Sequence, residues 1–170
     1  SRGTLIATER NKHRFEDAIA QSSEMGMSDV VWKLGDASEC PVNGANKILI
    51  DAPCTSTGMI HSHPSFKWRL NKKTLFSIMT IQNKILEGIL SAYSNSPGTE
   101  IVYATCSILP HEGESQIDSI LEKYPIELIE IPLVETQGYP NFKCSSMVRR
   151  MFPHTHYTDG FFIAKMRITQ

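Results

Sequence analysis

Short apolar runs alternate with longer segments of helical periodicity along this chain. Runs bounded by turn residues, a pattern typical of buried strands, lie at residues 4–8, 29–34, 47–52, 100–105, 126–131 and 160–168. Apolar residues three and four apart predict helices over 11–25, over 71–93 behind an Asn71 N-cap, and after Pro110. Strands that alternate with helices form parallel sheets covered on both faces, so the pattern predicts an α/β fold with a largely parallel sheet.

The alternation breaks in two places. No helical pattern separates the runs at 126–131 and 160–168, so we expect one of these strands to run antiparallel at an edge of the sheet. Residues 55–70 are rich in Ser, Thr, Gly, His and Pro and show no periodicity. A loop of this length inside a compact domain usually has a function.

Two cysteine motifs stand at the ends of predicted strands. Asp51-Ala52-Pro53-Cys54 closes the run 47–50, and Thr105-Cys106-Ser107 closes the run 100–104. Ligands of an open α/β sheet bind in the crevice beyond the carboxyl ends of its strands. Two cysteines and an aspartate at that edge therefore predict a site for thiol chemistry, in which nearby positive charge or a base must activate a thiol.

Acidic residues close the first three predicted strands: Glu9, Asp36 and Asp51. An acidic residue beyond a strand can accept hydrogen bonds from ribose hydroxyls, and Asp36 can do the same for an adenine amine. One such residue is weak support, since Asp is common in turns. Acidic residues at successive strand ends favour a ligand that contains a nucleoside.

The composition limits the kind of partner. The 170 residues are 41% hydrophobic with a formal net charge of −1, which suits one globular domain without an overall nucleic-acid signature. Any polyanion site must then be a local basic patch, such as the cluster around His61, Lys67 and Arg69. On charge alone, a solvated basic face explains this cluster equally well.

The cysteine spacing and the apolar runs indicate where such a protein works. The four cysteines form no C-x-x-C pair, so the sequence predicts no metal site. No secretory pattern is present and no apolar run approaches the roughly 20 residues of a membrane span. A reducing, cytoplasmic location without membrane contact is the default expectation.

Several motifs follow one another in a recognisable order. They read D-A-P-C-T-S-T-G at 51–58, H-P at 63–64 with K-W-R at 67–69, Y-A-T-C-S-I at 103–108 with Glu112 and Glu114, and R-M-F-P-H at 150–154 with D-G-F-F-I-A at 159–164. Together they resemble the Nol/Nop/Sun (Fmu/Sun, Rsm-type) family of RNA cytosine-5 methyltransferases. The resemblance is collinear over nearly the whole chain.

The resemblance implies a Rossmann-like class I methyltransferase sheet, S-adenosyl-L-methionine as cofactor, and an RNA substrate such as rRNA or tRNA. It implies that Cys106 is the nucleophile and that Cys54 assists proton removal. Asp51 would bind the cytosine and, with Glu9 and Asp36, the cofactor. The residues expected to contact RNA are His61, Lys67, Arg69, Arg150 and His154.

The chain also departs from this family. The family carries a first strand and a glycine-rich loop upstream of the strand that ends at Glu9, and no such sequence occurs here. The resemblance then implies that residues 1–170 are the C-terminal part of a catalytic domain, truncated at the N-terminus. We expect the isolated chain to be inactive unless a missing N-terminal segment or a partner chain completes it.

Two other functions fit parts of the pattern. A non-catalytic RNA-binding or assembly module with a degenerate or split methyltransferase fold would explain the absent loop. A cysteine hydrolase built on Cys106 and a histidine is a weaker alternative, because no arrangement for an oxyanion is legible in the sequence. Retention of both Cys54 and Cys106 favours the methyltransferase.

Overall fold

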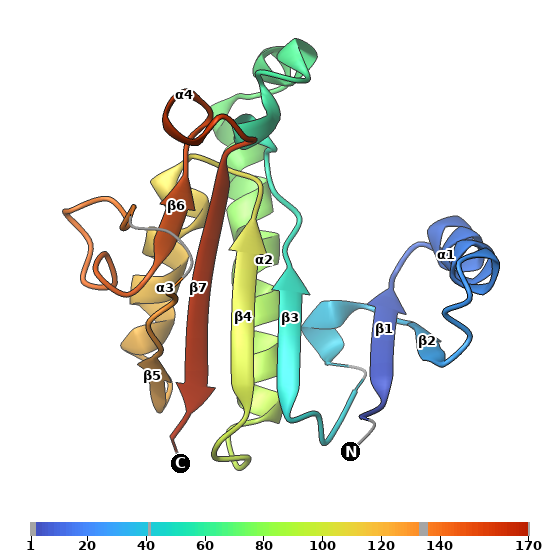
Figure 1. Cartoon of the computed structure of the whole chain (residues 1–170). Coiled ribbons are helices and arrows are strands. Elements are labelled where there is room, and N and C mark those ends of the chain that lie inside the picture. Colours follow the sequence, from blue (N-terminus) through green and yellow to red (C-terminus); the bar gives the residue numbers. More distant parts are fainter. Residues whose placement is uncertain (1–2, 41, 133–135, 170) are drawn as a thin grey trace.

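The computed structural model describes residues 3–40, 42–132 and 136–169 (Figure 1). Its strands are β1 (Leu5–Glu9), β2 (Val30–Leu34), β3 (Lys47–Asp51), β4 (Glu100–Thr105), β5 (Ile126–Leu128), β6 (Arg149–Met151) and β7 (Phe161–Ile168). Its α-helices are α1 (Lys12–Glu24), α2 (Lys72–Ala92), α3 (Glu114–Leu121) and α4 (Pro153–His156). Short 3-10 turns are η1 (Ala37–Glu39), η2 (Thr57–Met59), η3 (Pro64–Trp68) and η4 (Pro110–Glu112).

The strands form two groups. β1 and β2 pair in parallel, and the larger sheet has the order β3-β4-β7-β5, with β6 paired to the first part of β7. β3 and β4 are parallel, whereas β7 runs antiparallel to β4, β5 and β6. The predicted α/β sheet with an antiparallel strand is confirmed. The edge strand β5 pairs antiparallel with β7, and β7 itself lies inside the sheet between β4 and β5.

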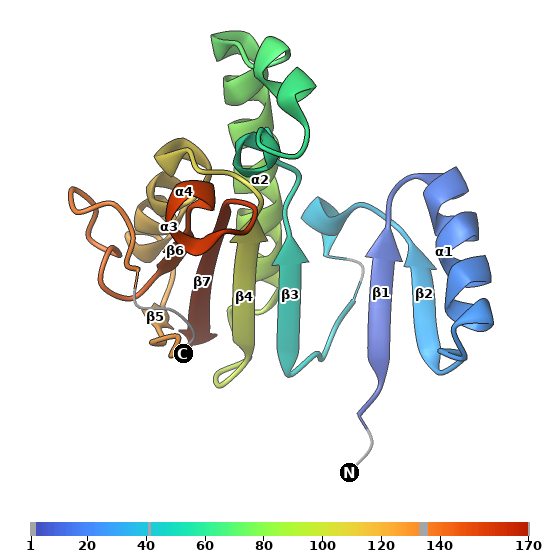
Figure 2. The same ribbon diagram turned by 45° about the horizontal axis from the view of Figure 1, so that its top comes forward.

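The parallel strands bring the cysteine motifs to one edge. β1, β3 and β4 point the same way in Figure 2, so their carboxyl ends lie at the same edge of the molecule. Asp51 is in register with Ala104, and the amide of Ala52 extends this ladder by donating to the Ala104 carbonyl at 3.0 Å. The residues that follow β3 and β4 therefore lie side by side.

The hydrophobic core lies between the larger sheet and helices α2 and α3 (Figure 1). The apolar stripe of α2 is buried there, as the predicted spacing requires: Ile85, Leu86, Ile89 and Leu90. The Asn71 side chain caps α2 by accepting from the amide of Thr74 at 2.9 Å, which confirms the predicted N-cap. No helix in the described part of the chain is long and apolar enough to span a membrane.

The segment between β2 and β3 joins the two strand groups through α2. A Cβ placed on Gly88 of α2 would overlap the carbonyl of Ser38, so only glycine allows this approach of η1. The Tyr93 hydroxyl donates to the carbonyl of Val42 at 3.0 Å and accepts from the amide of Ala45 at 3.1 Å. These contacts attach β1 and β2 to the same helix that covers the larger sheet.

Candidate active site

The two cysteine motifs meet at the carboxyl edge of the larger sheet. Cys54 follows β3 and Cys106 follows β4, and their sulfur atoms lie 3.0 Å apart. Both side chains are partly buried. The sequence predicted that these residues share an edge, and the structure brings their sulfur atoms into hydrogen-bond contact.

This contact shifts the pKa values of the two thiols in opposite directions. A hydrogen bond from the Cys54 thiol is the largest influence that lowers the pKa of Cys106, to about 6. The same hydrogen bond, together with burial, raises the pKa of Cys54 well above its usual value. Near neutral pH, Cys106 is therefore a thiolate and Cys54 keeps its proton, so Cys106 is the stronger nucleophile of the pair.

Ser56 is a neighbour of Cys106 that the sequence did not single out. Its hydroxyl lies 3.5 Å from the Cys106 sulfur and contributes to the lowered pKa of Cys106. Its backbone has a φ of 55°, a left-handed conformation that turns the chain sharply after the Pro-Cys step. The motif carried no signal for this role, because any small turn residue could occupy that place.

Asp51 ends β3 beside the cysteines. It is exposed, and its charge partly opposes the lowering of the Cys106 pKa. Because side chains alternate along a strand, Asp51 lies on the face opposite the buried Ile50. On that face it borders an apolar hollow of about 390 Å³. The other residues of the hollow are Leu49, Val102, Ala104, Phe161 and Ile163.

Two glycines from distant motifs hold the cysteine loops close to β7. The amide of Gly58 donates to the carbonyl of Cys106 at 3.0 Å, and the amide of Gly160 donates to the carbonyl of Gly58 at 2.9 Å. A Cβ on Gly58 would overlap the backbone of Gly160. The glycine in each motif is therefore required by a backbone contact between the two motifs.

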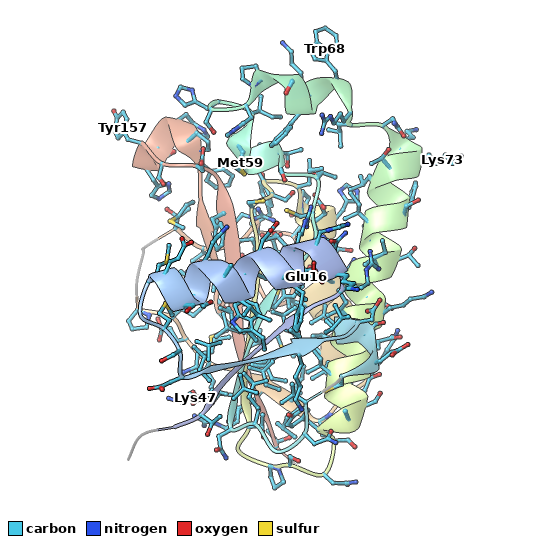
Figure 3. All side chains as sticks on the ribbon, turned by 90° about the vertical axis from the view of Figure 1, so that its right-hand side faces the viewer. Glu16, Lys47, Met59, Trp68, Lys73 and Tyr157 are labelled. Atoms are coloured by element: carbon cyan, nitrogen blue, oxygen red, sulfur yellow. The ribbon has the colours of Figure 1, made fainter. Side chains whose placement is uncertain are left out.

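The basic residues predicted to contact RNA divide into two groups. His61, Lys67, Arg69 and His154 are exposed. Arg69 also lines a cavity of about 220 Å³ together with Cys54, which connects the basic loop to the thiol site. Figure 3 shows Trp68, which is 81% exposed, at the outer tip of this segment, and the Lys67 ammonium lies 5.1 Å from its ring centroid. The loop thus presents charge and an aromatic surface at the edge of the site.

Arg150 does not belong with these residues. Its side chain is fully buried and forms two hydrogen bonds of 2.6 Å to the carboxylate of Glu114, which is equally buried. The guanidinium lies between the rings of Tyr139 and Phe162 and donates to the carbonyl of Ser107 at 3.0 Å. The structure contradicts the predicted RNA contact, because no phosphate reaches a guanidinium enclosed in this way.

Glu9 and Asp36 stand at the carboxyl ends of the paired strands β1 and β2. One oxygen of Glu9 accepts from the amide of Asn11 at 2.7 Å. Asp36 accepts from the amide and hydroxyl of Ser38, which hold its pKa below the usual value, and from Arg10 at 3.4 Å. Each carboxylate shapes its own turn, and Glu9 keeps a second oxygen for another donor.

Cys40 and Cys144 lie away from the thiol pair. Both pack against the hydrophobic core, and burial raises the pKa of each. Both therefore act as small apolar side chains of the core.

Comparison with known proteins identifies relatives of this chain. A family model for the 16S rRNA methyltransferases RsmB/F matches residues 1–167. The chain is 34% identical to the 26S rRNA (cytosine-C(5))-methyltransferase nsun-1 of Caenorhabditis elegans, covering 97% of this chain and 27% of that protein. It is 36% identical to ribosomal RNA small subunit methyltransferase B of Yersinia pseudotuberculosis, covering 95% of this chain and 36% of that protein.

Solved structures agree with this relationship. NSun6 from Pyrococcus horikoshii, crystallised with SFG, superposes with a TM-score of 0.85 at 28% identity, over 99% of this chain and 42% of that one. A methyltransferase homologue from the same organism gives 0.82 at 28% identity, over 97% of this chain and 53% of that one. The chain thus spans about half or less of the length of these relatives. By its motifs, its fold and the match over residues 1–167, the chain belongs to the RsmB/F family of 16S rRNA methyltransferases.

Proposed function

We propose that this chain supplies the thiol site of an S-adenosyl-L-methionine-dependent RNA cytosine-5 methyltransferase that acts on rRNA. One observation carries the proposal: a lowered-pKa Cys106 sulfur lies 3.0 Å from a protonated Cys54. Carbon 5 of cytosine is a poor nucleophile, and addition of a thiolate at carbon 6 makes it reactive. A thiolate beside a second thiol is the arrangement that this chemistry needs.

Cys106 opens the reaction by forming a bond from its sulfur to carbon 6 of the base. The displaced electron pair moves onto the ring, and Asp51 binds the polar edge of the cytosine where charge changes. When bound, S-adenosyl-L-methionine supplies an electrophilic methyl group to carbon 5. Cys54 gives its own proton to solvent and, as a thiolate, takes the proton from carbon 5; the electron pair of that C–H bond then expels the Cys106 thiolate.

The proton shared by the two sulfurs explains why Cys54 acts second. Before the reaction, the neighbouring thiolate holds the pKa of Cys54 high. Once the Cys106 sulfur is a thioether, it is uncharged and is a much weaker hydrogen-bond acceptor. The pKa of Cys54 then falls toward its ordinary value of about 8.5, which makes Cys54 a usable base only after the covalent bond has formed.

The acidic residues at the ends of β1 and β2 are suited to bind the nucleoside of S-adenosyl-L-methionine. Glu9 has a carboxylate oxygen without a donor in the described residues, and it stands beside Asp36 at the ends of paired strands. Ribose hydroxyls and an adenine amine are donors of the kind that such carboxylates accept. Glu9 and Asp36 would hold the nucleoside, and Asp51 would lie toward the reacting end.

We also propose that residues 1–170 form part of a catalytic domain that a further strand completes. Within the described residues, no backbone pairing joins β1 to β3, although both run in the same direction (Figure 1). Leu5 of β1 and Leu49 of β3 are 59% and 72% exposed. A strand between β1 and β3 would pair with both edges and join the two groups into one sheet. It would come from an N-terminal segment or from a partner chain.

The exposed basic residues would bind the RNA. His61, Lys67 and Arg69 are exposed on the segment between β3 and α2, His154 is exposed in α4, and phosphate contacts are made by such side chains. The four cysteines are free in the structure, which fits a reducing compartment such as the cytoplasm.

The test uses the full-length protein that carries this chain, with its RNA and S-adenosyl-L-methionine. Cys54→Ala should accumulate a protein–RNA adduct that survives denaturation, because Cys106 cannot be released. Cys106→Ala should form no adduct and no 5-methylcytosine. An adduct that forms through Cys54 would reverse the two roles. A protein that binds RNA but forms neither product nor adduct would support the alternative of a non-catalytic module.

A further inference from the structure

Glu112 is buried between the two cysteine loops. Its side chain is inaccessible to solvent, and one carboxylate oxygen accepts from the Thr55 hydroxyl and from the Ser107 hydroxyl, each at 2.5 Å. The other oxygen accepts from the Thr55 amide at 2.8 Å and from the Gln82 side chain at 3.2 Å. The carboxylate therefore receives donors from β3's loop, β4's loop and helix α2.

No cation accounts for this burial. Among the described residues, no Lys, Arg or His forms an ion pair with Glu112, whereas Glu114 two residues later pairs with Arg150. Burying a carboxylate is costly unless hydrogen bonds replace its water. Only neutral donors bind the Glu112 carboxylate. The position of Glu112 therefore depends on the two cysteine loops, and the positions of the loops depend on Glu112.

The donors are the residues that follow the two cysteines. Thr55 comes directly after Cys54, and Ser107 comes directly after Cys106. Because both hydroxyls bind the same oxygen of Glu112, the carboxylate fixes the separation of the two loops at the point where the sulfur atoms face each other. The Ser107 hydroxyl also lies 2.9 Å from that of Thr57, which extends the link along the first loop.

We propose that Glu112 is a positioning residue that holds the Cys54 and Cys106 sulfur atoms in hydrogen-bond contact. It touches neither sulfur and acts through the loops. Its catalytic consequence rests on the proposed function, because a thiolate at Cys106 and a thiol at Cys54 are needed there. The structural claim, that Glu112 maintains the shared proton, does not depend on RNA or cofactor.

The experiment measures how the alkylation rate of Cys106 by iodoacetamide varies with pH, using mass spectrometry to follow the Cys106 peptide of the whole chain. The unmodified protein should show a midpoint near pH 6, the pKa expected for Cys106. Glu112→Gln keeps the shape but removes acceptors, and its midpoint should rise by more than one pH unit, toward the ordinary thiol value of about 8.5.

A matched control lies one residue before Cys106. The hydroxyl of Thr105 is buried and has no hydrogen-bond partner among the described residues, so Thr105→Val makes a comparable change without touching the link. Its midpoint should stay near that of the unmodified protein. Thr55→Val removes one hydroxyl from Glu112 and keeps the backbone bond, so its midpoint should rise even if Glu112→Gln does not fold.

A double-mutant comparison shows whether Glu112 acts through the pair. In a Cys54→Ala background, the midpoint of Cys106 is already raised, and adding Glu112→Gln should change it little. Unchanged midpoints in Glu112→Gln or Thr55→Val would overturn the proposal, and so would a full additional shift in the Cys54→Ala background. Since the assay uses no RNA and no methyl donor, a failure of methylation leaves its result intact.

Discussion

The guanidinium of Arg150 and the carboxylate of Glu114 form a bidentate ion pair. Both hydrogen bonds are 2.6 Å long and both side chains are fully buried. Arg150 also donates to the carbonyls of Ser107 and Leu109, on the loop that follows Cys106. A motif arginine that seemed suited to phosphate thus supports the loop after Cys106 from inside the protein.

Removing one partner of this pair should destabilise the protein strongly. Arg150→Ala leaves the Glu114 carboxylate buried without its cation, and such changes cost about 3–5 kcal/mol of unfolding free energy. Urea unfolding followed by circular dichroism measures the loss. Arg167→Ala, which breaks solvent-accessible pairs with Glu100 and Glu127, is the control and should cost much less. A loss for Arg150→Ala no larger than that control would contradict the assignment.

The same arginine shows where sequence reasoning succeeds and where it stops. Local sequence patterns were enough to predict β4, whose predicted and observed bounds agree, and the Asn71 N-cap. β6 was not predicted, because Arg149-Arg150-Met151 has no apolar alternation; it forms by pairing with β7. Burial of Arg150 with Glu114 depends on a contact 36 residues away, which no local window contains.

In the candidate site too, some features follow from the local sequence and others depend on how the loops pack. Placing Cys54 and Cys106 at one edge needs only the parallel strand pattern, and the motif resemblance supplies their roles. The 3.0 Å sulfur contact and the buried position of Glu112 depend on how the β3 and β4 loops pack against each other. Glu112 and Glu114 lie in the first turns of η4 and α3, and both are buried acceptors that organise the cysteine loops, which no local pattern indicates.

The contact between Gly58 and Gly160 predicts a second stability effect. Gly58→Ala puts a methyl group against the backbone of Gly160, which cannot move as a flexible side chain can. Overpacking of this kind costs about 1–3 kcal/mol. Gly3→Ala is the matched control, because a Cβ there meets no atom within 4 Å. Thermal unfolding of both variants measures the difference, and equal midpoints would show that the two loops are not held together by this contact.

The thiol pair should oxidise to a disulfide under mild hydrogen peroxide. The Cys106 thiolate attacks the peroxide, which gives a sulfenic acid and hydroxide, and the Cys54 sulfur then displaces hydroxide to form the disulfide. Overall, the two thiols lose two protons and two electrons, and the peroxide becomes two water molecules. The first step needs the thiolate, so its rate should rise as the pH increases through about 6, the pKa of Cys106.

Peptide mapping without reductant detects this disulfide. Cys54→Ala should stop at the sulfenic acid of Cys106. Cys106→Ala should react slowly, because the activated thiolate is gone and burial still raises the pKa of Cys54. Cys40 and Cys144 should remain reduced in the same sample, since burial raises the pKa of each. Preferential oxidation of Cys40 or Cys144 would show that Cys106 is not the activated thiol.

RNA affinity should depend on salt through Lys67 and Arg69. Each phosphate contact releases counterions, so Lys67→Ala or Arg69→Ala should reduce the slope of log affinity against log salt by about one unit. Trp68→Ala removes a stacking surface without a charge, so it should weaken binding at every salt concentration and leave the slope unchanged. Lys47→Ala is the charge control, because Lys47 lies at the opposite end of the molecule from Trp68 (Figure 3). Thermal stability of all four variants should change little, because these side chains are exposed. If the Lys67 and Arg69 variants lose stability while the slope stays constant, these side chains brace the loop and do not bind RNA.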